Sequence, residues 1–96
     1  MGNNSLETAR KNIDRINREL VLLLIERMKE VDQVAAWKKA NNQPVHVPAR
    51  EEAIIEKVRS LAGEEFASEI ETVFRAIFSA SCAREERRIK HTEELS

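Results

Sequence analysis

A segment of about 36 residues, from Ser5 to about Ala40, contains neither proline nor glycine. Its apolar residues recur at alternating spacings of three and four, which is typical of an amphipathic helix. Asn41, Asn42 and Pro44 end the pattern, because asparagine favours turns and proline restricts the residue before it. Such a helix would be roughly 54 Å long, whereas a compact chain of 96 residues has a radius of gyration of only about 12 to 13 Å. The chain cannot cover this helix by itself.

The remainder of the chain predicts two further helices. Pro48 suits the first turn of a helix over 48–62, which ends before Gly63. A third apolar stripe predicts a helix over about 66–90. We therefore expect an all-α fold with three helices per chain, one very long, one short and one medium, in a single domain over 1–96. Because the long helix needs cover from outside its own chain, we expect an intertwined helical homodimer.

The start of the third helix has two candidate signals. The acidic pair Glu64 and Glu65 follows Gly63 directly, and Ser68 with Glu71 has the spacing of a capping box. The sequence alone leaves both open.

Composition excludes several classes of function. Sixteen basic and seventeen acidic residues give a net charge of -1, and with no tyrosine and 4% aromatic residues we expect no nucleic-acid partner. The longest apolar run, Leu20 to Ile25, is too short to span a membrane, and the N-terminus lacks the apolar core of a signal peptide. The lone Cys82 fits a reducing compartment, so we expect a cytoplasmic protein.

Three cations lie on or beside the apolar face of the predicted long helix. A buried cation is costly unless an anion accompanies it, so this pattern indicates a buried dianion. Arg27 and Lys38 are eleven residues apart, which is three turns, and they share a helix face. Arg10 is seventeen residues before Arg27, about 25 Å along the axis, so it cannot reach the same small ligand within one chain. In an antiparallel dimer, Arg10 of one copy would approach the Arg27 and Lys38 site of the other.

These residues carry a resemblance to a known family. From about Leu6 to about Arg88, the chain resembles an all-helical chorismate mutase of the AroQ class. The matching segments, in order and at the spacing of the family, are Leu6 to Arg10 with Ile13, LLLIER at 22–27, Lys38 before a proline loop, Pro48-Ala49-Arg50-Glu51, and the pair Ser81 and Glu85.

The resemblance implies an isomerase that converts chorismate to prephenate in aromatic amino acid biosynthesis by a Claisen rearrangement. This pericyclic step needs no metal, cofactor or covalent intermediate. The substrate carries two carboxylates, and its ether oxygen gains negative charge as the ether bond breaks. Cations fixed in a dry pocket therefore stabilise the transition state more than the ground state.

The resemblance assigns the carboxylates of the substrate to basic and hydroxyl side chains. Arg10 from the partner chain and Arg27 would bind the two carboxylates, since a guanidinium grips a carboxylate with two hydrogen bonds. Ser81 would assist through its hydroxyl. Arg50 would support the same anionic pocket.

Three further residues are assigned to the ether oxygen and the ring hydroxyl. Lys38 would donate to the ether oxygen, and Glu51 would accept from the ring hydroxyl. Glu85 matches the second donor to the ether oxygen, which requires a protonated carboxyl. We therefore predict that activity falls with rising pH and that Glu85→Gln flattens the profile. Val47 stands where many members of the family have an acidic residue, so other chorismate-type substrates remain alternatives to chorismate.

Several alternatives remain open at this stage. An isochorismate pyruvate-lyase and an amino-deoxychorismate mutase would use a similar anion site. A non-enzymatic helical interaction module would use the long apolar stripe as a coiled-coil seam. Cys82 is interpreted as a small core residue and Trp37 as core or interface, and His46 has no partner at metal-ligand spacing, so we assign no metal.

Overall fold

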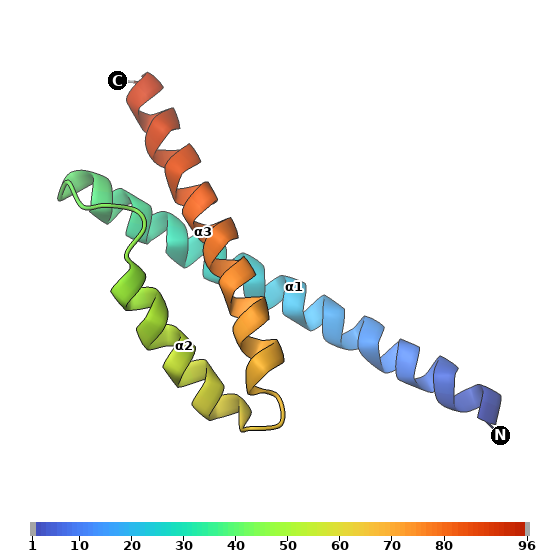
Figure 1. The fold of residues 1–96 in the computed structure, drawn as a ribbon. Helices are drawn as coiled ribbons and strands as arrows, with labels where there is room; N and C mark the ends of the chain where they lie inside the picture. The colour runs from blue at the N-terminus through green and yellow to red at the C-terminus, as the bar shows by residue number, and fades with distance from the viewer. Residues whose placement is uncertain (1, 96) are drawn as a thin grey trace. The chain divides into compact units, whose positions relative to one another are not determined.

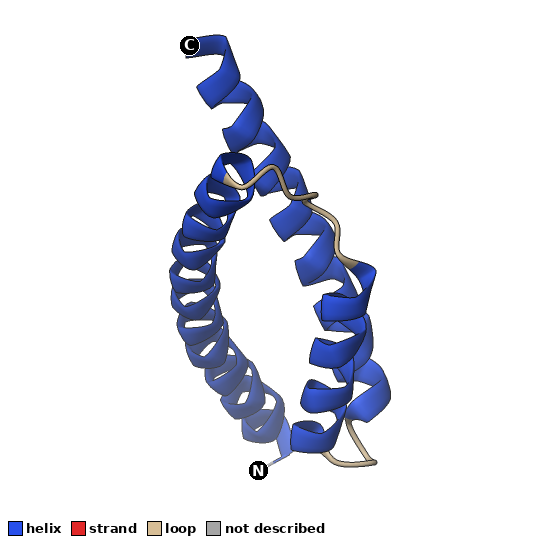
Figure 2. Ribbon diagram, turned by 90° about the vertical axis from the view of Figure 1, so that its left-hand side faces the viewer, coloured by secondary structure: helices blue, strands red, loops and turns tan. Residues whose placement is uncertain are grey.

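The computed structural model describes residues 2–95. Within them the chain forms three α-helices and no strand: α1 over Gly2–Ala40, α2 over Pro48–Ala62 and α3 over Ala67–Leu95 (Figures 1 and 2). The predicted all-α class with three helices is confirmed. α3 continues beyond the predicted end near residue 90 to Leu95, and Glu93, Glu94 and Leu95 in this extension have high helix propensity.

Backbone geometry explains the turn between α2 and α3. Gly63 has a φ of +82°, a conformation that residues with a Cβ rarely adopt, and its N–H donates to the carbonyl of Arg59 at 3.1 Å. α3 then begins at Ala67, so Ser68 lies inside the helix, where its carbonyl accepts a hydrogen bond from Thr72 Oγ1 at 3.1 Å. Neither candidate start signal therefore sits at the first helical residue.

A tight turn joins α1 to α2. The N–H of Gln43 donates to the carbonyl of Lys38 at 2.8 Å, and Asn42 has a φ of +54°, a left-handed conformation that asparagine tolerates. Pro48 then occupies the start of α2 after Val47, which makes no capping hydrogen bond through its side chain. This turn brings the backbone of residues 43–47 back toward the last turn of α1.

The chain consists of two compact units, Met1–Glu30 and Val31–Ser96. In the second unit, α2 and α3 pack side by side (Figures 1 and 2). Phe74 and Phe78 make an edge-to-face contact with ring centroids 6.2 Å apart. The buried apolar side chains of this unit come from all three helices: Val31, Ala35, Ile55, Ala67 and Phe78.

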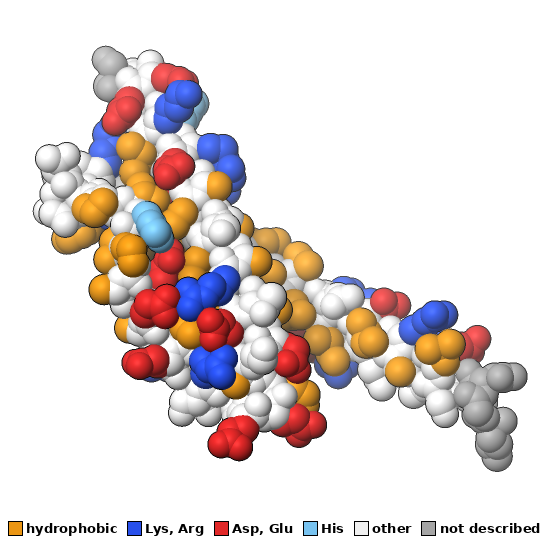
Figure 3. Space-filling view, in the orientation of Figure 1, with side chains coloured by type: hydrophobic (Ala, Val, Ile, Leu, Met, Phe, Trp, Pro, Cys, Tyr) orange, Lys and Arg blue, Asp and Glu red, His pale blue; other side chains and the backbone are white. Residues whose placement is uncertain are grey.

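Charged side chains bridge α2 and α3 on the surface of the second unit. Arg75 Nη1 lies 2.9 Å from Glu52 Oε1, and Arg75 Nη2 lies 3.0 Å from Glu71 Oε2. Arg59 Nη1 reaches Glu71 Oε1 at 2.7 Å. Figure 3 shows these helices covered by mixed blue and red side chains. Exposed ion pairs contribute little singly, but this network fixes the register of the two helices.

The first unit is a single stretch of α1 whose apolar stripe is exposed. Leu20 is 49% exposed and Leu23 is 61% exposed, and Leu6, Ile13 and Ile16 are exposed as well. Figure 3 shows hydrophobic side chains along this part of α1. A row of large apolar side chains in water marks an interaction surface.

No helix among the described residues combines the length and the apolar character needed to cross a membrane.

Candidate active site

Lys38 and Glu85 form an ion pair inside the second unit. Lys38 Nζ, from the last turn of α1, lies 2.9 Å from Glu85 Oε1, from α3. The side chains are only 13% and 7% exposed. A buried pair of this kind is costly to desolvate, and it is weak evidence for a role in stability alone. The pair is therefore the first candidate for function.

The turn after α1 fixes the position of the Lys38 ammonium. Lys38 Nζ donates a hydrogen bond of 2.6 Å to the carbonyl of Val45. An ammonium has three N–H donors, and the carbonyl of Val45 engages one of them, while Glu85 Oε1 lies within ion-pair distance. This largely buried ammonium thus keeps donor capacity for a ligand.

Glu85 is the more deeply buried member of the pair. Its Oε1 atom accepts no hydrogen bond of favourable geometry from any described residue, although it is close to Lys38 Nζ. Ser81 lies one helical turn earlier on α3 and is also buried. α3 therefore carries a buried hydroxyl and a buried carboxyl side chain on one face.

Glu51 extends this polar cluster from the first turn of α2. His46 Nε2 lies 3.2 Å from Glu51 Oε1, and the thiol of Cys82 is 3.8 Å from Glu51 Oε2. Burial raises the pKa of the Cys82 thiol, and the negative charges of Glu51 and Glu85 raise it further, while Lys38 opposes them. The pKa of Cys82 thus depends on both carboxylates, Glu51 and Glu85.

The remaining predicted residues are more exposed. Arg50 is exposed on the first turn of α2. Arg10 is exposed and Arg27 is partly buried, and both belong to the first unit. Within the second unit the structure brings together Lys38 and Glu85, and Glu51 contacts Cys82 on α3.

Sequence reasoning missed three contacts of the second unit. It treated Cys82 as a small core residue and His46 only as a rejected metal ligand, yet both contact Glu51. The spacing of Cys82, three residues before Glu85 on one helix face, was an available signal. Asp32 was not considered at all.

Asp32 binds two arginines of α3. Arg84 Nε and Nη2 donate to its two carboxylate oxygens at 2.6 and 2.7 Å, and Arg88 Nε lies 3.3 Å from Oδ1. The hydrogen bond from Arg84 is the main cause that lowers the pKa of Asp32, and the charges of both arginines act in the same direction. Arg84 and Arg88 are thereby directed to Asp32, which holds α1 and α3 together within the second unit.

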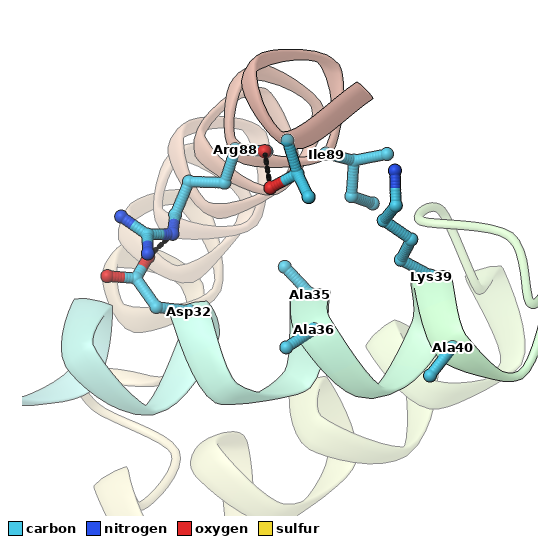
Figure 4. Close-up of a pocket in the computed structure, with 8 residues that line it drawn as sticks. Asp32, Ala35, Ala36, Lys39, Ala40, Arg88 and Ile89 are labelled. Atoms are coloured by element: carbon cyan, nitrogen blue, oxygen red, sulfur yellow. Dashed lines mark hydrogen bonds and ion pairs between the residues drawn. The ribbon is translucent and has the colours of Figure 1, made fainter. Parts of the chain in front are cut away.

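An open pocket of about 270 Å³ lies beside this ion pair (Figure 4). It has an alanine-rich floor from α1 and is flanked by charged side chains, and Figure 4 shows Arg88 reaching Asp32 at its edge. Neither Lys38 nor Glu85 lines it, so this pocket is separate from the candidate active site. Its lining residues are Asp32, Ala35, Ala36, Lys39, Ala40, Arg88, Ile89 and Thr92.

Within residues 2–95, no three His, Cys, Asp or Glu side chains gather closely enough to hold a metal ion.

Comparison with known proteins gives a family and two relatives. Residues 9–86 match the family described as chorismate mutase type II. Over 90 residues the chain is 39% identical to the bifunctional chorismate mutase/prephenate dehydratase of Aquifex aeolicus, covering 88% of this chain and 25% of that protein. Over 84 residues it is 34% identical to the T-protein of Haemophilus influenzae, covering 84% of this chain and 22% of that protein. The chain thus spans about a quarter of the length of these relatives. No solved structure matches significantly.

Proposed function

Because the chain belongs to the chorismate mutase type II family, we propose that it is a chorismate mutase, which isomerises chorismate to prephenate in aromatic amino acid biosynthesis. The observation that carries the proposal is the buried pair of Lys38 and Glu85. Both residues lie at positions where the family places donors to the ether oxygen of the substrate.

Lys38 acts in this proposal through its unengaged N–H donor. As the ether bond of chorismate breaks, its oxygen gains negative charge, and an ammonium held at that oxygen stabilises the transition state. The contacts of Lys38 with Val45 and Glu85 support this role, because they fix the ammonium before the substrate arrives. A preorganised charge needs little rearrangement during the reaction.

Glu85 needs two protonation states in this proposal. The ion pair with Lys38 uses the carboxylate, whereas donation to the ether oxygen requires the protonated acid. Glu85→Gln, whose amide donates in every state, separates hydrogen-bond donation from charge.

The substrate carboxylates complete the proposed site. Arg27 binds one carboxylate with the help of Ser81, Arg10 of a second copy binds the other, and Arg50 adds positive charge at the rim. Glu51 accepts from the ring hydroxyl. The guanidinium groups suit this task, since each can grip a carboxylate with two parallel hydrogen bonds.

The exposed stripe of the first unit supports an intertwined homodimer as part of this proposal. α1 has 39 residues, and large apolar side chains from Leu6 to Leu23 are exposed in the isolated chain. A second copy would bury this stripe and bring its own Arg10 to the site, in two equivalent places by symmetry. In this assembly residues 1–96 act as one domain, and the reduced thiol of Cys82 fits a cytoplasmic location.

Loss of chorismate absorbance, with identification of the product, tests the proposed reaction. We expect prephenate to form in stoichiometric amounts with no release of pyruvate. Release of pyruvate would identify a lyase instead, an aminated product from amino-deoxychorismate would identify the related mutase, and no turnover of any of these substrates would favour an interaction module.

A further inference from the structure

The Glu51 carboxylate is held at both of its oxygens by side chains from two other parts of the fold. His46, in the turn before α2, lies 3.2 Å from Oε1, and Cys82, on α3, lies 3.8 Å from Oε2. Glu51 is 20% exposed, whereas His46 is 62% exposed and covers it from the solvent side. The Glu51 carboxylate therefore lies between the exposed His46 and the partly buried Cys82.

The direction of both contacts follows from their chemistry. An ionised carboxylate only accepts hydrogen bonds, so the contact is an N–H···O hydrogen bond to Glu51 in the tautomer of His46 that carries its hydrogen on Nε2. Cys82 remains a thiol at neutral pH, because burial and the neighbouring carboxylates raise its pKa, and its S–H donates weakly to Oε2. Both neighbours act as donors to Glu51.

These contacts leave Glu51 able to bind a ligand. A carboxylate has about four lone-pair sites, and one imidazole and one thiol engage two of them. The first turn of α2 favours a negative charge there but does not select one side-chain orientation. His46 and Cys82 contact the two oxygens of Glu51, whereas Val47 offers no polar side-chain atom.

We propose that His46 and Cys82 are positioning residues that orient Glu51 to accept the ring hydroxyl of the substrate, an inference that rests on the proposed function. Neither side chain touches the reacting atoms. Their contribution is to hold the Glu51 carboxylate, so that it recognises the hydroxyl without side-chain ordering at the moment of binding. The pair thereby tunes substrate choice and leaves the rearrangement itself to Lys38 and Glu85.

A comparison of two substrates tests this proposal. Chorismate and an analogue with hydrogen in place of the ring hydroxyl are assayed with the full chain and with His46→Ala and Cys82→Ala. For chorismate, we expect kcat/KM to fall about fivefold in His46→Ala and about twofold in Cys82→Ala, mainly through KM, because the hydroxyl contact is the same in ground and transition states. For the analogue, we expect both variants to have the same kcat/KM as the parent protein.

Conservative variants and a matched control sharpen the test. His46→Gln and Cys82→Ser keep a donor and should restore the preference for chorismate. His91→Ala removes an exposed histidine from α3 and should leave kcat/KM unchanged for both substrates. Thermal unfolding followed by circular dichroism checks that each variant is folded.

Two results would overturn the proposal in different ways. Equal losses of kcat/KM on both substrates, or no loss on chorismate, would show that His46 and Cys82 do not orient Glu51 toward the hydroxyl. Either result would leave the proposed mutase function standing. A parent protein that turns over neither substrate would overturn the proposed function, and this inference with it.

Discussion

The Lys38 ammonium lies 2.9 Å from the Glu85 carboxylate and joins the last turn of α1 to α3 within the second unit. Both side chains are almost completely buried, and the carbonyl of Val45 fixes the ammonium from the other side. The donor capacity that the ammonium keeps is available to a ligand.

Lys38→Ala removes the cation of the pair. We expect kcat/KM for chorismate to fall by on the order of 10²- to 10³-fold, because a fixed donor at the developing charge is lost. We also expect a loss of about 3 kcal/mol in the free energy of unfolding, because Glu85 stays buried without its partner. Enzyme kinetics and urea unfolding measure the two effects. Lys39→Ala is the matched control, since Lys39 is more exposed and lies 3.8 Å from Glu93, and an equal effect of both changes would contradict the assignment.

Glu85→Gln separates hydrogen-bond donation from charge. In the parent protein only the protonated Glu85 donates to the ether oxygen, so kcat/KM should decrease as the pH rises. The amide of Gln donates at every pH, so the profile of the variant should be flat. Steady-state kinetics between mildly acidic and alkaline pH measure this difference. A level profile in the parent protein would remove Glu85 from this role.

Asp32→Asn tests the link between α1 and α3. The hydrogen bond from Arg84 lowers the pKa of Asp32 in the folded state, so the ionised pair stabilises the fold above the ordinary pKa of the carboxyl. This stability disappears as the pH falls through the lowered pKa. The variant should therefore be less stable than the parent at neutral pH, and the two should converge in acid. Urea unfolding midpoints across this pH range measure the convergence, and parallel curves would argue against it.

Cys82 should react slowly with alkylating reagents. Burial and the negative charges of Glu51 and Glu85 raise its pKa, so little thiolate is present at mildly alkaline pH. We expect iodoacetamide to modify the folded protein more slowly than the protein unfolded in urea. Glu51→Gln should speed the reaction by removing one negative charge, whereas Glu52→Gln, on the exposed side of α2, should not. Mass spectrometry follows the modification, and identical rates in all forms would contradict the geometry.

The helices were predictable because their signals are local. The apolar spacing in residues 5–40, the stop at Asn41 and Pro44, and Pro48 with Gly63 each report on a few neighbouring residues. The extension of α3 to Leu95 was not predicted, because residues 91–95 carry no apolar stripe, although Glu93, Glu94 and Leu95 have high helix propensity.

The contacts of the site were only partly predictable. Lys38 stands out as a cation on the apolar face of the long helix, Glu85 stands out only through the family pattern, and the roles assigned to them and to the other site residues remain predictions. The bond between Arg84 and Asp32 joins residues 52 positions apart, and that between Cys82 and Glu51 joins residues 31 positions apart. Such pairs depend on how helices pack, so they cannot be predicted from the periodicity of a single helix.

Mixing two inactive variants tests the composite site most directly. Arg10→Ala damages the residue that each subunit contributes to its partner, and Lys38→Ala damages the site of its own chain. After unfolding and refolding together in equal amounts, about half of the dimers should contain one copy of each variant, with one of their two sites intact, so activity should recover to about a quarter of that of the parent protein. Mixtures that stay as inactive as the separate variants would contradict a site built from two subunits.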